Sequence, residues 1–410
     1  MYRIDPERVY VTAWALQDER AQERLQRLAT ACGQPNPPVL SLAELADTVR
    51  DRGWLASGGR TGAAKGSGDP DILLNAFVFD EAEAARRMAE YPELREWLLA
   101  GQSPVGLRDS RQPLEAQGTI CQTALELHCA YGCLHSCDYC HVGGLFNIMV
   151  NLEALAEHVA RVVAENPWCR LYKFDNTTDT ITLEPEYGAS EIMVGLFARQ
   201  RDAFLMLYTK SDNVDHLLRL DHRGQTLISW SLAADTASRL IEKKTPPLPA
   251  RLQAMHKCQE AGYRVRARLS PICPVHNWRQ EATELVEGLF AHAQPEIITM
   301  DVLGWMNARQ MLAALDVELL DAPFRDFVHA QAQFEPGPHR KHLFPHEMRR
   351  EVLRYVLGEI RRVSPQTPVS ICMETVQMWQ DMGPELGMTP ENYACCCGPT
   401  SVPGHPLMGG

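Results

Sequence analysis

The residues of this chain best placed to do chemistry are three cysteines in one short segment, CLHSCDYCHVGG. Cys133, Cys137 and Cys140 are separated by three and then two residues, so one loop can offer three thiolates. Cysteine thiolates are the usual ligands of iron–sulfur clusters, and three of them leave the fourth iron of a [4Fe–4S] cubane open. A structural zinc site normally needs four ligands, often as two C-x2-C pairs. The spacing therefore predicts a [4Fe–4S] cluster, with a zinc site or scattered buried thiols as the alternatives.

The cysteine motif, with an aromatic residue before its last cysteine, resembles that of the radical S-adenosylmethionine (SAM) superfamily. The resemblance implies that the amino and carboxylate groups of SAM occupy the open iron, and that Tyr139 meets the adenine. It also implies that an electron from the cluster cleaves SAM to methionine and a 5′-deoxyadenosyl radical, which takes a hydrogen atom from the substrate. In such an enzyme the cofactor supplies the reactivity, and the protein positions the reactants and excludes water.

Strands and helices that alternate along the chain would position this loop. From about residue 122, short apolar stretches predict strands within 123–130, 170–176, 204–210, 226–232, 263–272 and 296–303. Between them, helical patterns occupy 151–165, 188–201, 212–219, 248–262 and 279–291. Such alternation implies right-handed βαβ units, a parallel sheet and an active site at the carboxyl ends of the strands. Six repeats favour an α/β fold with a partial (β/α)6 barrel, and a flat, doubly wound sheet is the alternative.

The segments before and after this barrel are predicted to be additions to it. Residues 1–115 form a mixed α/β extension, the barrel occupies 116–304, and 305–410 is a mainly helical region with a Cys-rich tail. Within the additions we expect a strand near 7–16, helices over 17–31 and 81–99, loops over 56–71 and 333–345, and a seventh strand at 367–375.

Beyond the cysteine loop, the chain resembles the spore photoproduct lyases and their relatives over roughly residues 6–300. The likeness is carried, in order, by PERVYVTAWAL, VNLEALAEHV, NTTDTITLEP, LYTKSDNVDHLL, ISWSL and IEKKTPPLPARLQAMHKCQEAGYRVRARLSPICP. It implies that family's partial (β/α)6 barrel and SAM contacts at Thr178, Asp179, Lys210 and Ser231. A lysine suits the SAM carboxylate, and hydroxyl or carboxylate groups suit its amino group and ribose. Alternatively, Thr178 and Asp179 only cap a turn.

Departures from the lyases bear on the substrate. Asn176 stands where the lyases carry a cysteine that returns a hydrogen atom to the product radical, and His141 stands where they carry a tyrosine. The late segment FEPGPHRKHLFPHEM has few of the lysines that grip DNA in that family. The chain carries 52 acidic residues against 40 Lys and Arg, a formal net charge of -12, which opposes a polyanionic partner. These features predict that DNA is not the substrate.

Some biosynthetic relatives act on sugars, and the apramycin-pathway enzyme that dehydrates paromamine is the comparison of choice. We therefore predict a hydroxylated, cationic small-molecule substrate that undergoes dehydration or bond cleavage, as in antibiotic biosynthesis. An acidic rim would attract a cation, and carboxylates or a histidine could assist a leaving hydroxide. Repair of a DNA photoproduct and a non-catalytic metal-binding protein are the alternatives. The catalytic candidates are Asn176, His141, Asp175, Asp301 and Glu374. Two further carboxylates are expected at the rim, Glu184 and Glu186. Glu242 is assigned to packing.

The remaining expectations concern location, partners and the tail. No signal-peptide core and no apolar run long enough for a bilayer are found, so a cytoplasmic protein without membrane contact is expected. A flavodoxin or similar reductase would supply electrons. The 13 irregularly spaced cysteines indicate metal binding more than disulfides in a reducing compartment. Cys395, Cys396 and Cys397 could hold an auxiliary cluster, supply a hydrogen donor, or be an accidental run.

Overall fold

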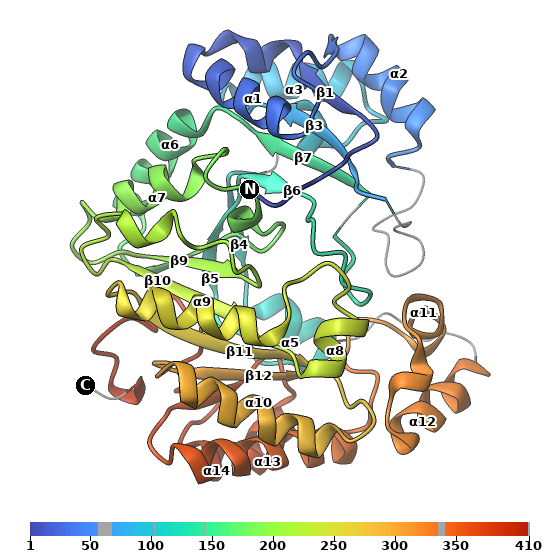
Figure 1. Ribbon diagram of the computed structural model, residues 1–410, viewed down its shortest axis with the longest axis vertical. Helices are drawn as coiled ribbons and strands as arrows, with labels where there is room; N and C mark the ends of the chain where they lie inside the picture. Colours follow the sequence, from blue (N-terminus) through green and yellow to red (C-terminus); the bar gives the residue numbers. More distant parts are fainter. Residues whose placement is uncertain (56–67, 102, 143, 335–340, 409–410) are drawn as a thin grey trace.

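The computed structural model describes residues 1–55, 68–101, 103–142, 144–334 and 341–408, and this part of the chain is a mixed α/β fold with two sheets (Figure 1). Within these residues the larger sheet has eight strands, in the order β13-β12-β11-β10-β9-β8-β5-β4. Neighbouring strands are parallel except at one edge, where β4 runs antiparallel to β5. The strands are β4 (Val105–Arg108), β5 (Ala124–Leu127), β8 (Leu171–Phe174), β9 (Phe204–Thr209), β10 (Thr226–Ser231), β11 (Arg264–Ile272), β12 (Ile298–Val302) and β13 (Val369–Ile371).

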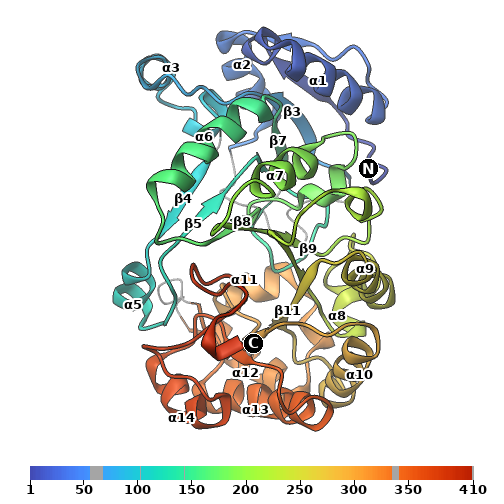
Figure 2. The ribbon, with the colours of Figure 1, turned by 90° about the vertical axis from the view of Figure 1, so that its left-hand side faces the viewer.

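Helices connect the parallel strands and pack on the sheet. Every residue of β10 and of β12 is buried, which is typical of a parallel sheet covered on both faces. Helix α9 packs on β10 and β11, α7 packs on β9, and α13 packs on β12. Figure 2 shows α9 and α10 on the outer side of the strands. These helices are α6 (Leu152–Glu165), α7 (Ala189–Phe197), α8 (Asp235–Leu240), α9 (Leu248–Glu260), α10 (Trp278–His292) and α13 (His346–Val363).

The second sheet joins the N-terminal region to the cysteine loop. Among the described residues its strand order is β2-β1-β3-β7-β6, parallel except that β6 runs antiparallel to β7. Strand β6 (Ala130–Tyr131) precedes the three cysteines and β7 (Leu145–Met149) follows them, so this sheet anchors the loop at both ends. The other elements here are β1 (Val9–Thr12), β2 (Val39–Leu40), β3 (Asp71–Asn75), α1 (Glu19–Ala31), α2 (Leu42–Arg52), α3 (Glu81–Glu90), α4 (Glu96–Leu99) and α5 (Arg111–Gln117).

The C-terminal region returns to the larger sheet twice. Strand β13 pairs with β12, which confirms the predicted seventh strand. The tail then packs against the strands: the N–H of Cys396 donates to Thr299 Oγ1 at 2.9 Å, and the Pro399 carbonyl accepts from the N–H of Leu171 at 3.0 Å. The three adjacent cysteines of the tail are therefore buried, and Cys396 bonds to β12 through Thr299 and to β11 through Arg266. The region's helices are α11 (Ala308–Ala314), α12 (Ala322–Ala332), α13 and α14 (Val376–Leu386).

The predicted strands of the parallel sheet are confirmed, and the differences elsewhere have local causes. The helix expected over 81–99 is interrupted between α3 and α4, because Pro92 and the residue before it disfavour helix. Over 212–219 the structure has only the short 3-10 helix Leu217–Arg219, since the side chain of Asn213 donates to the carbonyls of Ile181 and Glu184. The loop expected over 56–71 lies mostly outside the described residues, as does part of that at 333–345. None of the described helices has the length and apolar character that a bilayer crossing requires.

Candidate functional site

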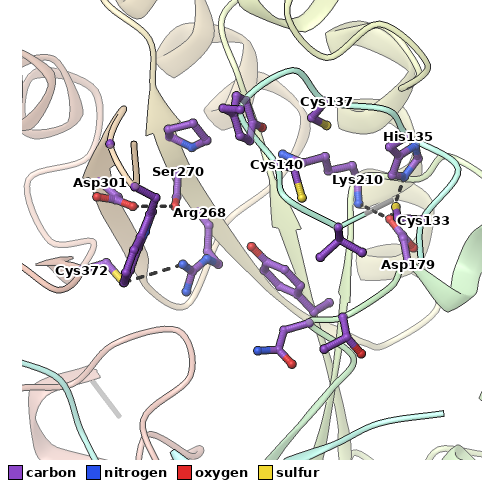
Figure 3. Close-up of a pocket in the computed structure, with 18 of the residues that line it drawn as sticks. Cys133, His135, Cys137, Cys140, Asp179, Lys210, Arg268, Ser270, Asp301 and Cys372 are labelled. Carbon is purple, nitrogen blue, oxygen red and sulfur yellow. Dashed lines mark hydrogen bonds and ion pairs between the residues drawn. The ribbon is translucent and has the colours of Figure 1, made fainter. Parts of the chain in front are cut away.

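A cavity of about 280 Å³ opens at the carboxyl ends of the parallel strands. Its wall comes from the cysteine loop and from residues that end or follow β8, β9, β11, β12 and β13. Parallel α/β folds place their sites at this edge. Figure 3 shows the labelled side chains in two groups that face each other. The cysteine-loop wall contains Cys133, His135, Cys137, Cys140, Asp179 and Lys210, and the opposite wall contains Arg268, Ser270, Asp301 and Cys372.

The three cysteines predicted as cluster ligands all line this cavity. Their loop is fixed from outside, because the N–H of Asp138 donates to the Ile241 carbonyl at 2.9 Å and Lys243 pairs with the Asp138 carboxylate at 2.9 Å. Among the described residues, no group of three or more His, Cys, Asp or Glu side chains is arranged to hold a single metal ion. A cubane makes a different demand, because each cysteine binds its own iron. Three cysteines on one loop at the cavity wall suit three irons of a cubane, whose fourth iron takes another ligand.

Asp179 is buried on the cysteine-loop wall and ties three segments together. Its carboxylate accepts hydrogen bonds from His135 Nε2 at 2.8 Å, from Thr209 Oγ1 at 2.8 and 2.9 Å, and from the backbone N–H of Lys210 at 2.8 Å. These bonds fix the cysteine loop to the ends of β8 and β9. His135 was not predicted from the sequence, where its only signal is its position between two of the cluster cysteines.

Thr178 and Ser231, both predicted SAM contacts, are placed differently. Thr178 lines the cavity, and its buried hydroxyl oxygen finds no partner among the described residues. Leaving such a group unpaired costs about 1–3 kcal/mol, so a ligand that satisfies it would be favoured. Ser231 is not part of the described lining; its hydroxyl donates at 2.8 Å to Tyr208 Oη, which does line the cavity. Tyr208 was not predicted from the sequence.

Lys210 and Tyr139 meet at one buried carboxylate, that of Glu242. Lys210 Nζ lies 2.8 Å from Glu242 Oε1, the Tyr139 hydroxyl donates to the same oxygen, and Arg251 pairs with Oε2 at 2.6 Å. Burial alone would raise the pKa of Glu242, but Lys210 and Arg251 outweigh it and lower the pKa to about 2. Glu242, assigned to packing from the sequence, thus stabilises the fold by forming ion pairs with Lys210 and Arg251. An ammonium has three N–H donors, so Lys210 can serve Glu242 and a second acceptor in the cavity.

The opposite wall carries a buried cation and an ion pair. Asp301 pairs with Lys341 and lies 3.2 Å from Ser270 Oγ. Arg268 is 7% exposed, and its Nη2 lies 3.7 Å from the sulfur of Cys372. No carboxylate among the described residues pairs with Arg268, and its Nε has no hydrogen-bond partner there. A buried donor without a partner calls for an explanation, and a ligand in the cavity that Arg268 lines would supply one.

The other predicted catalytic residues are scattered. Asn176 lines the cavity and donates to Glu126 at 2.9 Å, whereas His141 is exposed and outside the described lining. Asp175 is fully buried and accepts from His128 Nδ1 at 2.8 Å and from the N–H of Cys129 at 2.8 Å.

Three further predicted carboxylates also lie outside the lining. Glu374 is buried and pairs with Arg349 at 3.0 Å. Glu184 caps the start of α7, and Glu186 pairs with the chain's amino terminus.

The acidic rim expected for a cationic sugar is therefore absent from the described lining. Of the five carboxylates proposed for it, only Asp301 reaches the cavity, and Lys341 neutralises it. The lining instead holds three cations, Lys210, Arg268 and Lys341, against two carboxylates, Asp179 and Asp301. The polar groups at hand suit carbonyl or anionic oxygens better than ammonium groups.

The family model described as "Spore photoproduct lyase" matches residues 105–309, half of the chain. The chain belongs to the spore photoproduct lyase family. Similar curated proteins include the spore photoproduct lyases of Bacillus subtilis (strain 168), 27% identical over 42% of this chain, and of Geobacillus sp. (strain Y412MC61), 26% identical over 39% of it. The matched segment spans about half the length of these relatives, 52% and 49%.

Solved structures of the family show the same fold. A spore photoproduct lyase complexed with dinucleoside spore photoproduct superposes with a TM-score of 0.60 at 16% identity, over 90% of this chain and 99% of that one. A doubly substituted spore photoproduct lyase with bound AdoMet and dinucleoside spore photoproduct gives a TM-score of 0.55 over the same shares. The comparisons thus favour photoproduct cleavage, our alternative at the level of sequence, over the dehydration of a sugar.

Proposed function

We propose that this chain is a radical SAM lyase that cleaves a dinucleoside photoproduct of the kind its structural relative binds. The observation that carries the proposal is the meeting, in one cavity at the strand ends, of the three loop cysteines with Thr178 and Lys210. Family membership gives this arrangement its chemistry. On the same grounds we propose that the larger sheet is the family's partial (β/α)6 barrel.

Cys133, Cys137 and Cys140 would hold three irons of a [4Fe–4S] cluster, and SAM would lie along the cysteine-loop wall. When bound, these cofactors supply a 5′-deoxyadenosyl radical. Lys210, held in place by Glu242, would donate to the SAM carboxylate, and the orphaned hydroxyl of Thr178 would bond a polar atom of SAM. Asp179 holds the loop and β9 in register and makes no step of its own.

The opposite wall then faces the substrate. Arg268 offers an unpaired N–H to an oxygen, and pyrimidine bases present carbonyl oxygens at their edges. The Tyr208 ring lies against two cations, with the Arg268 guanidinium carbon 5.3 Å and Lys173 Nζ 4.5 Å from its centroid. Electrons would come from a low-potential donor such as a flavodoxin.

Anaerobic reconstitution with iron and sulfide, followed by SAM and dithionite, tests the proposal. Dinucleoside spore photoproduct and paromamine are supplied in parallel, and 5′-deoxyadenosine and substrate-derived products are quantified. We expect the photoproduct to be converted to its two thymidine units and paromamine to remain intact. A dehydrated sugar, with an untouched photoproduct, would refute the proposal.

A further inference from the structure

A fourth cysteine, Cys372, stands on the cavity wall opposite the three cluster cysteines (Figure 3). It directly follows β13, and among the described lining residues it is the one thiol outside the cysteine loop. The S–H bond of a thiol is weaker than the C–H, N–H and alcohol O–H bonds of other side chains, so a thiol readily gives a hydrogen atom to a carbon radical.

The turn that carries Cys372 is held rigidly. The N–H of Cys372 donates to the Met300 carbonyl at 2.8 Å. Met373 has a left-handed φ of 48°, and His342 Nε2 lies 2.9 Å from its carbonyl oxygen. A non-glycine residue in this region costs about 1–3 kcal/mol and persists only where the surroundings enforce it. The buried ion pair of Glu374 with Arg349 further holds this turn in place.

Arg268 supplies the second, independent sign that a ligand approaches this wall. It is more than nine-tenths buried, lines the cavity and keeps an unpaired Nε. Its two terminal nitrogens lie 3.7 Å from the sulfur of Cys372 and 3.6 Å from that of Cys397. Arg108 Nη1 contacts Cys397 from the other side at 3.4 Å.

The pKa values of the two sulfurs beside Arg268 shift in opposite directions. Burial raises the pKa of Cys372 against the effect of Arg268, so this group keeps its S–H at neutral pH. The hydrogen bond from Cys395, with Arg108 and Arg268, lowers the pKa of Cys397 well below its ordinary value. Of the two, Cys372 is the one that belongs to the described lining of the cavity.

We propose that Cys372 is the hydrogen-atom donor that closes the radical reaction, an inference that rests on the proposed function. After the bond between the two bases breaks, one base carries an unpaired electron on carbon. The S–H bond of Cys372 breaks and a C–H bond forms, which leaves the closed-shell product and a thiyl radical on Cys372. One electron from the low-potential reductant converts the thiyl to a thiolate beside Arg268, and one solvent proton restores the thiol.

The test follows deuterium from solvent into product. Reconstituted holoenzyme, SAM, dithionite and dinucleoside spore photoproduct are combined in D2O, where each turnover recharges Cys372 with deuterium. We expect one deuterium per product molecule in the wild type. In Cys372→Ser the product formed per 5′-deoxyadenosine should fall about tenfold or more, equivalent to about 1.4 kcal/mol on the barrier. Its iron content and SAM binding should stay unchanged, because both belong to the other wall.

The matched control is Cys121→Ser, the same substitution at a half-buried cysteine outside the described lining. It should behave as wild type. A readout independent of turnover is alkylation of Cys372 by iodoacetamide, which bound dinucleoside should slow. Deuterated product at wild-type yield from Cys372→Ser, or alkylation indifferent to the dinucleoside, overturns the inference and leaves the proposed function standing. Absence of product from the wild type refutes the proposed function, and this inference with it.

Discussion

Replacing Glu242 by Gln should destabilise the protein strongly before any cofactor is considered. The carboxylate is fully buried between Lys210 and Arg251, at 2.8 and 2.6 Å, and also accepts from Tyr139. Glutamine keeps the shape and can accept from Tyr139, but it leaves two cations without their counter-charge. Removing one partner of a buried ion pair costs about 3–5 kcal/mol, because the remaining charge stays buried and unpaired.

The pKa of Glu242 gives a second route to this magnitude. In the folded protein it is lowered to about 2 from an ordinary 4.5, and at about 1.36 kcal/mol per pKa unit this corresponds to about 3 kcal/mol. The folded-state pKa is the lower one, so this stability is fully present above pH 4.5. It is lost as the pH falls from there towards 2, because protons then bind the unfolded chain first.

Urea unfolding of the apoprotein at pH 7, followed by fluorescence, measures the loss. The matched control is Glu385→Gln, because Glu385 pairs with Arg354 at the same 2.8 Å but both side chains are 44% exposed. Exposed pairs contribute about 0–1 kcal/mol, so this control should unfold almost as wild type does. A Glu242→Gln loss no larger than that of Glu385→Gln would refute the argument that burial sets the strength of this contact.

Three further predictions concern the cysteine-loop wall. Cys140→Ala should lose the cluster and SAM cleavage together, measured as iron content and the brown absorbance band; an intact cluster would contradict the assignment. Lys210→Ala should keep the cluster but weaken SAM binding by about 2–5 kcal/mol, as loss of a desolvated charge partner does, when SAM is titrated against reconstituted protein. Thr178→Val should leave apoprotein stability within about 1 kcal/mol of wild type, since its hydroxyl has no protein partner, and weaken SAM binding by about 0.5–1.5 kcal/mol. Unchanged SAM affinity in that variant would show that the hydroxyl faces something else.

Local patterns in the sequence were enough to predict the frame of the site. Buried parallel strands read as short apolar runs, so the seven strands from β5 to β13 in the larger sheet fall inside predicted segments. The x3/x2 cysteine spacing located the loop that the structure brings to the cavity. Strand β7 was missed because Leu145–Met149 follows the loop directly, and its partner β3 lies some 70 residues earlier in the chain. Pairing at that separation leaves no local periodicity to detect.

The sequence could not show which carboxylates line the cavity, for a different reason. Asp175, Asp301 and Glu374 all follow or end strands, and position alone makes them equivalent. Their neighbours decide otherwise: Asp175 faces His128, Asp301 faces the cavity beside Lys341, and Glu374 faces Arg349. Each partner comes from a distant segment, so only the folded chain shows which carboxylate remains to meet a ligand.

The net charge of the chain and the charge of the cavity must likewise be considered separately. A net charge of -12 describes the whole chain and opposes long-range attraction of a polyanion such as duplex DNA. A ligand inside a cavity meets only the groups that line it, and within the described lining cations outnumber carboxylates by three to two. The cation that lacks a carboxylate partner there is Arg268, which stands next to Cys372 on the wall we assign to the substrate. The net charge of the whole chain therefore affects how a large nucleic acid approaches. The charged groups of the cavity instead affect which small lesion binds there. An enzyme built this way should accept a dinucleoside more readily than the same lesion within a long duplex, and the ratio of the two rates at low salt measures that preference. Faster turnover of the duplex lesion would show that a basic surface outside the cavity governs binding.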